Sequence, residues 1–535
     1  MLASVEVRLG EERPNMTAAA AVTNENKPAL TLFGLLAACF GLFYVLNVIG
    51  KIGAPLSPQS LVLLVAVALP AIRLRARDLP SQFVVIAYAI NGCCVFYLIG
   101  MHRTYDLGLP SLFNSVWAPV FVGMLAFRWP ALIAFPALAA RWAKLHTQFE
   151  TGLGAPNSAD FVIIPDLALF LSIAVSIYAV YRILEDRLPV TRVRKETFFN
   201  ACIMMASGIH LSNYFHSGWE KLFLPDSTPL TWVLQNPTYF LAIHSTDAGA
   251  LTILDLFPDR DTLVPFLTWL NVPLNAWVLV IQLYALFSLL SLRGSAWLTF
   301  LYDVMHFGIF VLTGIFFWKW IVLNVAFILA FRKMQKGERP SVAIRSLGCV
   351  IVLVAPLLSF HIVKLAWFDT GGVNDAYFEV ANQKGEILRV PSNFFLNKSI
   401  NVAQQRIARP TNGFLPTGTW GTTSRASIMF ALRDHCSAEA RDWALSDEQK
   451  TQLGKMVRAH QALVVRLADE SGRVAYDLYP HHIWSAPWLF DDFAKLDVRQ
   501  IRSYFFVVES RCVSIGTDGQ VIREPVRRER YEFKL

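Results

Sequence analysis

The chain has 535 residues, of which 54% are hydrophobic and only 16% are charged. An average globular chain is about 25% charged, so this composition excludes a soluble cytosolic enzyme, a disordered regulator and a fibrous protein. The net charge of +8 does not indicate nucleic acid as a partner. The basic excess lies in short loops between apolar runs, which is where membrane proteins place it.

Long apolar runs predict a polytopic all-α membrane domain over residues 30–365, preceded by a polar N-terminal tail, 1–29. A helix needs about 20 mainly apolar residues to cross a bilayer. We expect about eleven transmembrane helices, with two short passes in one long stretch that is broken at Arg128-Trp129-Pro130. The stretches are 30–50, 58–73, 82–101, 112–143 (two passes), 161–183, 198–218, 263–289, 296–316, 317–332 and 343–365.

Three basic groups predict the orientation, because cytoplasmic loops carry an excess of Lys and Arg. They lie at Arg73–Arg77, Arg187–Lys195 and Arg332–Arg339, and one path through the membrane places all three in the cytoplasm. On this path the N-terminus is cytoplasmic, whereas the acidic loop 219–262 and the C-terminal domain lie outside. We expect a multi-pass protein of a bacterial inner membrane.

The last part of the chain, residues 366–535, holds nearly half of the charged side chains and predicts a small soluble α+β domain. Alternating Tyr, Phe, Val and Ile predict strands in 376–390 and 500–524, with a turn at Thr517-Asp518-Gly519. Ser446 opens an amphipathic helix that extends to about Ala468. No spacing typical of a metal site is present, so we predict no metal. The pattern leaves open whether Cys436 and Cys512, the two cysteines of this domain, form a disulfide.

The densest set of polar residues in the membrane domain lies in the stretch 198–218 and just beyond it. Ionisable residues inside a span are costly, so each is a candidate for function. Gly218 permits a neighbouring helix to approach closely. A lysine at the end of a span also has a simpler interpretation, in which its ammonium reaches the aqueous interface. The polar residues share one narrow stripe, flanked by Asn213: His210, Tyr214, Ser217 and Lys221.

A second polar set lies in the stretch 296–316. Asp303 and His306 are three residues apart and share a helix face, the arrangement in which a carboxylate orients an imidazole. The alternative is a pair of buried polar side chains that form hydrogen bonds between helices. Lys319, between two tryptophans, is interpreted as an interfacial anchor, and His481 and His482 as a structural or interfacial pair.

The run from Asn213 to Leu222 resembles the Tyr-Phe-x-x-Gly-x-x-Lys-Leu helix of vitamin K-dependent γ-glutamyl carboxylases and their bacterial relatives. This superfamily shares the horizontally transferred transmembrane (HTTM) domain. The later segment from Ser291 to Gly314, with Arg293 and a helix that contains His306, Phe307 and Gly308, is similar to the family's second signature. The resemblance covers about residues 30–365, and its specific part is these two segments.

The resemblance implies a carboxylase-like enzyme of the lyase type with a reduced quinone as cofactor. Lys221 occupies the position of the catalytic base and His306 that of the family's histidine. The cavity for quinone or substrate would contain His210, Asn213, Tyr214, Ser217, Gly218 and Asp303. Burial in an apolar pocket favours the neutral amine that a base requires. Glu220 stands directly before Lys221 and is the anion expected to favour the protonated form of the lysine. The C-terminal domain is shorter than in the carboxylases.

The implied partners are membrane lipid or quinone and an exported peptide or protein. One alternative is a non-catalytic scaffold, or a peptide or toxin maturation and export factor, that presents its outer domain to a partner. A transporter is disfavoured because the sequence contains no inverted repeat and no matching pair of broken helices. The sequence leaves the substrate and the oligomeric state open.

Overall fold

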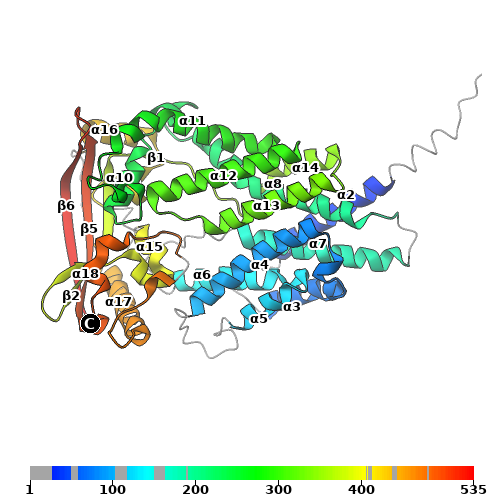
Figure 1. Ribbon diagram of the computed structural model, residues 1–535, viewed down its shortest axis with the longest axis horizontal. Helices are drawn as coiled ribbons and strands as arrows, with labels where there is room; N and C mark the ends of the chain where they lie inside the picture. Colours follow the sequence, from blue (N-terminus) through cyan, green and yellow to red (C-terminus); the bar gives the residue numbers. More distant parts are fainter. Residues whose placement is uncertain are drawn as a thin grey trace, which may run out of the picture.

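The computed structural model describes residues 27–49, 58–102, 117–149, 163–187, 191–404, 407, 413–436, 443–478 and 481–535. Helices lie lengthwise beside one another, and a β-sheet covers one end of them (Figure 1). The described helices of this bundle end near Leu358, and the first strand begins at Phe368.

Each apolar stretch of the sequence contains a helix in the described part of the chain. In chain order these helices are α2 (Lys27–Tyr44), α3 (Pro58–Ala68), α4 (Ser81–His102), α5 (Trp117–Ala126), α6 (Ala134–Phe149), α7 (Ile163–Glu185), α8 (Lys195–Leu222), α11 (Val264–Ser288), α12 (Leu292–Thr313), α13 (Trp318–Lys336) and α14 (Val342–Val354). Two short helices, α9 (Thr231–Gln235) and α10 (Tyr239–Asp247), lie between α8 and α11.

Among the described residues, five helical segments are long and apolar enough to cross a membrane: Lys27–Val48, Ser81–Gly100, Ile163–Glu185, Val264–Ser288 and Leu292–Thr313. Four shorter segments are also apolar: Leu61–Arg73, Trp117–Ala126, Pro130–Ala143 and Val342–Leu358. The expected number of eleven spans is therefore not supported. The shorter helices lack the length, and α8 and α13 carry too many polar residues.

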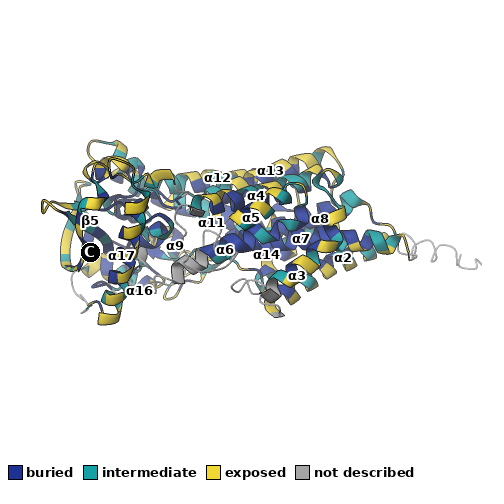
Figure 2. Ribbon diagram, turned by 90° about the horizontal axis from the view of Figure 1, so that it is seen from below, coloured by how far each residue is buried: buried dark blue, intermediate teal, exposed yellow. Residues whose placement is uncertain are grey.

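The polar helix α8 occupies the centre of the bundle. It packs against α7, α11 and α14, and every residue from Phe198 to Phe215 is buried. Figure 2 shows α7 and α8 as largely buried helices, whereas the outer helices carry exposed positions. Because neighbouring helices surround α8, its polar side chains find partners inside the protein and need not face lipid.

The basic segments predicted to share one side of the membrane converge at one end of the bundle. The Lys195 ammonium donates to the carbonyl oxygen of Asp78 at 2.9 Å, and Arg194 pairs with Glu338 at 3.0 Å. These contacts join the segments around Arg75, Arg194 and Arg339. The C-terminal domain lies at the opposite end (Figure 1).

The C-terminal domain is α+β, as predicted. Its sheet has four described antiparallel strands in the order β3-β2-β5-β6, and Gly519 adopts a positive φ in the predicted turn between β5 and β6. Val457 and Val464 of α17 pack with Tyr504 and Phe506 of β5 in one apolar core. The elements are β1 (Phe368–Asp369), β2 (Gly372–Asn382), β3 (Ile387–Arg389), α15 (Ser399–Ala403), β4 (Thr422–Thr423), α16 (Ala426–His435), α17 (Asp447–Leu467), α18 (Asp491–Ala494), β5 (Ile501–Ile515) and β6 (Val521–Lys534).

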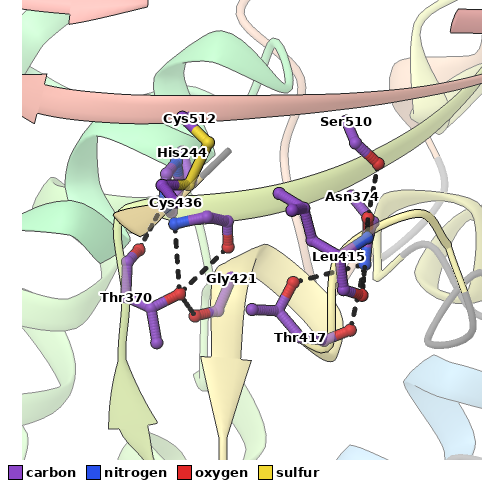
Figure 3. Close-up of a disulfide and its surroundings, with 10 residues drawn as sticks. His244, Thr370, Asn374, Leu415, Thr417, Gly421, Cys436, Ser510 and Cys512 are labelled. Carbon is purple, nitrogen blue, oxygen red and sulfur yellow. Dashed lines mark hydrogen bonds between the residues drawn. A yellow bond between two sulfur atoms is a disulfide. The ribbon is translucent and has the colours of Figure 1, made fainter. Parts of the chain in front are cut away.

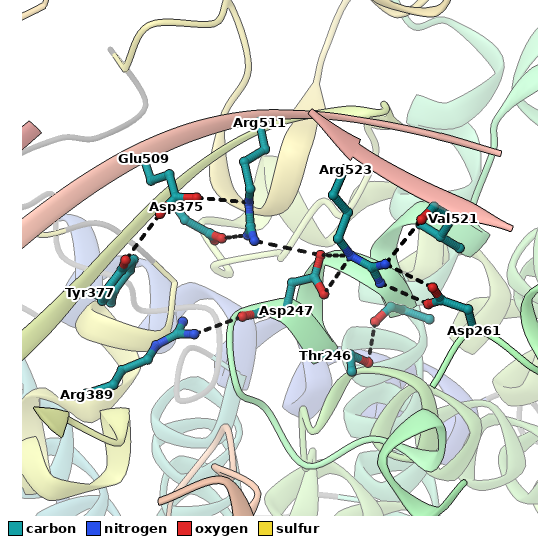
Figure 4. Close-up of polar contacts among 11 residues, drawn as sticks. Thr246, Asp247, Asp261, Asp375, Tyr377, Arg389, Glu509, Arg511, Val521 and Arg523 are labelled. Atoms are coloured by element: carbon teal, nitrogen blue, oxygen red, sulfur yellow. Dashed lines mark hydrogen bonds and ion pairs between the residues drawn. The ribbon is translucent and has the colours of Figure 1, made fainter. Parts of the chain in front are cut away.

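An ion-pair network joins the sheet to the acidic segment between α8 and α11 (Figure 4). Arg523 of β6 contacts the carboxylates of Asp247 and Asp261, each at 2.9 Å. These carboxylates raise the pKa of Arg523 above its usual value. Arg511 of β5 pairs with Asp375 and lies 3.9 Å from Asp247. The acidic residues of the connecting segment thus bind arginines of the C-terminal domain.

A second junction is made by backbone hydrogen bonds among three segments. The amide of Phe316 donates to the carbonyl of His482 at 2.7 Å, and the amide of Trp484 donates to that of Gly314 at 2.9 Å. Leu251 donates in turn to the carbonyl of Trp484 at 2.7 Å. Gly314 has a φ of +70°, and a Cβ there would lie 3.0 Å from Leu251 and Trp484 backbone atoms. The C-terminal domain therefore docks directly on the α12–α13 connection.

Cys436 and Cys512 form a disulfide that ties the end of α16 to β5 (Figure 3). This answers the question that the sequence left open. The other cysteines are free; Cys39, Cys93, Cys94 and Cys202 are buried in the helical part. A disulfide in the C-terminal domain is typical of an oxidising compartment.

Candidate functional site

The polar stripe of α8 divides between two neighbours. His210 and Tyr214 face α13, whereas Asn213, Ser217 and Lys221 face the extended segment that leads from the helical part into the C-terminal domain. Side chains spaced four residues apart on a helix line up one above the other, so the second group forms a ladder of hydrogen bonds.

The ladder binds the backbone of residues 363–365. The side-chain oxygen of Asn213 accepts from the amide of Val363 at 2.8 Å. The hydroxyl of Ser217 accepts from the amide of Leu365 at 3.0 Å and donates to the carbonyl of Val363 at 3.3 Å. The Lys221 ammonium donates to the carbonyl of Leu365. The stripe therefore satisfies the backbone groups of a partly buried extended segment.

Lys221 is buried, with 6% of its surface exposed. Besides Leu365, its ammonium donates to the carbonyl of Ser217 and to the side-chain oxygen of Gln282, each at 3.1 Å. It also lies 5.1 Å from the ring centre of Trp232, close enough for a cation–π interaction. These three acceptors match the three N–H donors of an ammonium. The interpretation of Lys221 as a snorkelling side chain is wrong, because its head group is buried.

Gly218 allows the approach of α11 that brings Gln282 to Lys221. A Cβ at this position would lie 2.8 Å from the Cβ of Gln282, which is closer than such atoms come. The prediction that Gly218 permits close helix packing is confirmed.

Glu220 does not act on Lys221 as expected. Its carboxylate pairs with Lys364 at 2.5 Å on a partly exposed surface, because consecutive helix residues point in different directions. The anion that acts on Lys221 is Asp369 of β1, which the sequence interpretation missed. Asp369 is 2% exposed, and burial raises its pKa to about 7 although the charge of Lys221 lowers it.

A second cluster lies deeper in the bundle, around Asn324 of α13. The His210 ring nitrogen Nε2 donates to Asn324 Oδ1 at 2.6 Å. The amide nitrogen of Asn324 donates to Asp303 Oδ1 at 2.8 Å and to the Tyr214 hydroxyl at 3.2 Å. Asn324 thus joins α8, α12 and α13. The sequence interpretation did not include it, although an amide inside an apolar stretch is a signal of the same kind as His210.

Aromatic rings enclose this deep cluster. Tyr214 stacks on Tyr302 with ring centres 3.6 Å apart, and His306 lies 5.8 Å from Tyr214 and 5.0 Å from Phe317. Trp320 adds a further ring 5.4 Å from His210. Within the described residues, the Nδ1 atoms of His210 and His306 are buried and have no hydrogen-bond partner.

Asp303 and His306 lie on the side of α12 that faces the protein interior. The expected contact, in which the Asp303 carboxylate orients the His306 imidazole, is not formed. Asp303 binds Asn324, whereas His306 is 4% exposed and contacts aromatic rings. His306 also approaches the C-terminal domain through Phe317, whose ring meets that of His482 edge-on at 5.0 Å. The structure thus brings together His210, Tyr214, Asp303 and His306.

The deep cluster and Lys221 occupy two levels of α8. Tyr214 and Lys221 are seven residues apart in the helix, a rise of about 10 Å. Tyr302 links the levels, because its ring stacks on Tyr214 while its hydroxyl donates to the carbonyl of Ile281, next to Gln282, at 2.9 Å. The expected cavity residues therefore form two adjacent groups.

The structure also corrects the interpretation of Lys319. Instead of anchoring at the interface, Lys319 is 2% exposed and lies 5.1 Å from the ring centre of Tyr97 in α4. By contrast His481 has a structural place in its own domain, where it meets Ser399 at 2.9 Å and the carbonyl of Tyr476 at 2.8 Å.

Comparisons of the chain with protein-family models, with curated proteins and with solved structures found no match in any of the three. The described residues contain no group of three or more His, Cys, Asp or Glu side chains that could hold a metal ion.

Proposed function

We propose that the protein is a membrane enzyme that acts on a reduced quinone and thereby modifies an exported peptide or protein, as its resemblance to the vitamin K-dependent carboxylases implies. The observation that carries this proposal is the polar cluster that His210 and Asp303 form around Asn324, with His306 beside it against Tyr214. Two imidazoles there keep a buried nitrogen without a hydrogen-bond partner in the described part of the chain, and such atoms require an explanation.

The residues present fit a reduced quinone, which is an aromatic ring with two hydroxyl groups. Tyr214, Trp320 and Phe317 offer aromatic surfaces, and the free Nδ1 atoms of His210 and His306 could bind the hydroxyl groups. When bound, the quinone supplies the redox chemistry with oxygen. The chain's own residues would orient it, exclude water and take up a proton. His306, in the deep cluster, is the proposed proton carrier, and Lys221, about 10 Å further along α8, is the proposed base that finally holds the proton.

A second candidate function is a scaffold that presents the C-terminal domain to a partner, such as a factor for peptide maturation or export. The ladder of Asn213, Ser217 and Lys221 on residues 363–365 favours it, because these side chains hold the segment that leads into that domain. On this view Lys221 contributes its hydrogen bonds and its charge, and no proton transfer takes place.

The two candidates differ in what they require of Lys221. For the enzyme we expect both Lys221→Ala and Lys221→Arg to slow the oxygen-dependent consumption of a reduced naphthoquinone by the purified protein at least ~100-fold, because loss of a general base costs 10²–10⁴-fold. A guanidinium keeps the charge but stays protonated. Consumption would be followed by chromatography of the quinone.

Glu220→Gln is the matched control, since Glu220 pairs with Lys364 at the surface and its loss should leave the rate unchanged. An Lys221→Arg protein as active as wild type would overturn the role of Lys221 as a base and would favour the scaffold.

We further propose a bacterial inner membrane as the location, with the N-terminus in the cytoplasm and the C-terminal domain outside. The convergence of the basic segments at one end of the bundle supports this orientation. The Cys436–Cys512 disulfide at the other end supports an oxidising environment for the C-terminal domain.

A reporter that is active only in the cytoplasm, fused after Leu535, is therefore expected to stay inactive in cells, whereas the same reporter fused after Gly337 should be active. Gly337 follows α13 at the end of the bundle where the basic segments meet. Activity of the fusion at Leu535 would reverse the orientation and place the disulfide in a reducing compartment.

A further inference from the structure

Asp369 is a buried carboxylate at the point where the chain enters the C-terminal domain. Its Oδ2 accepts from the side-chain amide of Asn236 at 2.9 Å, and its Oδ1 accepts from the indole N–H of Trp367 at 3.2 Å. Its own backbone amide donates to the side-chain oxygen of Asn236 at 2.7 Å. These three bonds hold the carboxyl group in one position beside α9.

Trp232 of α9 connects this carboxyl group to Lys221. The Lys221 ammonium lies 5.1 Å from the centre of the Trp232 ring, and the Trp232 indole donates to the carbonyl of Trp367 at 2.8 Å. Trp367 is also a donor to Asp369. Asp369 and Lys221 thus lie on one buried set of contacts between the helical part and the C-terminal domain.

The charges of the two groups act on each other. Burial is the larger influence on the pKa of Asp369 and raises it to about 7, and Lys221 is the ionisable group that lowers it. The nearby ionisable residues of α8 and of the linker, Glu220 and Lys364, pair with each other at the surface. The contacts from α9 and α11 are made by uncharged side chains, those of Trp232 and Gln282.

Lys221 and Asp369 form no direct ion pair; Trp232 and Trp367 lie between them and contact one of the two charged groups each. We propose that Asp369 is the counter-ion of Lys221 across these two tryptophans, so that a carboxylate of the C-terminal domain influences the charge of the buried amine in the helical part. Two opposite charges in a buried site stabilise each other, whereas either charge alone is costly there. Asp369 is therefore a positioning residue, and the site around Lys221 is complete only when the C-terminal domain is docked.

The consequence of this pairing for catalysis rests on the proposed role of Lys221 as a base. The pairing itself can be measured by thermal unfolding, without an assay of activity. We expect Lys221→Met and Asp369→Asn each to lower the midpoint of thermal unfolding in detergent by at least ~5 °C. The double variant should recover more than half of the summed loss, because it leaves no unpaired charge.

The control cycle combines Lys221→Met with Glu220→Gln. Glu220 is adjacent to Lys221 in sequence but pairs with Lys364, so the two shifts of the thermal midpoint should add. If a single variant does not fold at all, we expect the Lys221→Met/Asp369→Asn double variant to yield folded protein again. Shifts that add in the Asp369 cycle, or a double variant that stays unfolded, would overturn the pairing.

The outcomes separate this inference from the proposed function. A non-additive cycle together with an active Lys221→Arg protein would retain the pair and remove the enzymatic base. An additive cycle together with an inactive Lys221→Arg protein would retain the base and remove Asp369 as its counter-ion.

Discussion

Replacement of Asn324 by leucine is expected to destabilise the helical part strongly and to abolish quinone consumption. Leucine has the same number and branching of side-chain heavy atoms as asparagine, so the replacement leaves no cavity. Three hydrogen bonds disappear, however, to His210, Asp303 and Tyr214. Each polar group that loses its partner costs about 1–3 kcal/mol, so the total for the three groups is about 3–9 kcal/mol. The midpoint of thermal unfolding in detergent would measure it.

Thr299→Val is the matched control within the same bundle. Thr299 of α12 is 1% exposed, and its hydroxyl donates to the carbonyl of Ser295 in its own helix at 2.8 Å. Such a bond is local, and its loss leaves no other side chain without a partner. We expect a change below about 1 kcal/mol. If Asn324→Leu were as mild as Thr299→Val, the central place of Asn324 in the cluster would be refuted.

Helical periodicity predicted which residues of α8 lie near one another but not what each of them contacts. His210, Tyr214, Ser217 and Lys221 do follow one side of the helix, yet a small difference in angle decides the neighbour. Tyr214 meets Asn324 of α13, whereas Ser217 and Lys221 meet Leu365. These partners are more than a hundred residues away in the sequence, so no local pattern could identify them.

The residues that the sequence interpretation missed are those whose role depends on distant contacts. Asn324 carries no charge and stood in a stretch interpreted as a short span. Asp369 lies just beyond the last apolar stretch and was counted with the soluble domain. The anion expected to act on Lys221 was Glu220 because it is adjacent in sequence, but the two side chains leave the helix in different directions.

The fold of the C-terminal domain was the more predictable part. The alternation in 500–524 and the turn at Gly519 correspond to β5 and β6, because hairpin strands depend on local pattern and turn chemistry. The number of membrane spans was less predictable. Apolar runs locate helices, but α8 is polar because it is enclosed by other helices, and hydropathy does not distinguish such a helix from one that faces water.

Acidification is expected to unfold the C-terminal domain and the adjoining segment between α8 and α11, because three buried histidines in these two parts resist protonation. Burial lowers the pKa of His244 and His481 to about 4 and that of His460 to about 3. In the unfolded chain a histidine has a pKa of about 6.5. A lowered pKa contributes stability that is present above pH 6.5 and is lost as the pH falls toward the folded value.

His460 is the most informative of the three to replace. Its ring lies between Phe394 and Phe395, with centres 4.9 and 4.7 Å away, and its Nε2 is buried without a hydrogen-bond partner in the described part of the chain. At pH 5 the cost of keeping it neutral is about 2 kcal/mol, from 1.5 pH units below the unfolded pKa. His460→Leu should therefore lose fewer degrees of thermal midpoint than wild type between pH 7.5 and pH 5. His435→Leu, at an exposed position at the end of α16, should lose as many degrees as wild type. Equal losses in the His460→Leu and His435→Leu proteins would show that the acid sensitivity of the domain has another origin.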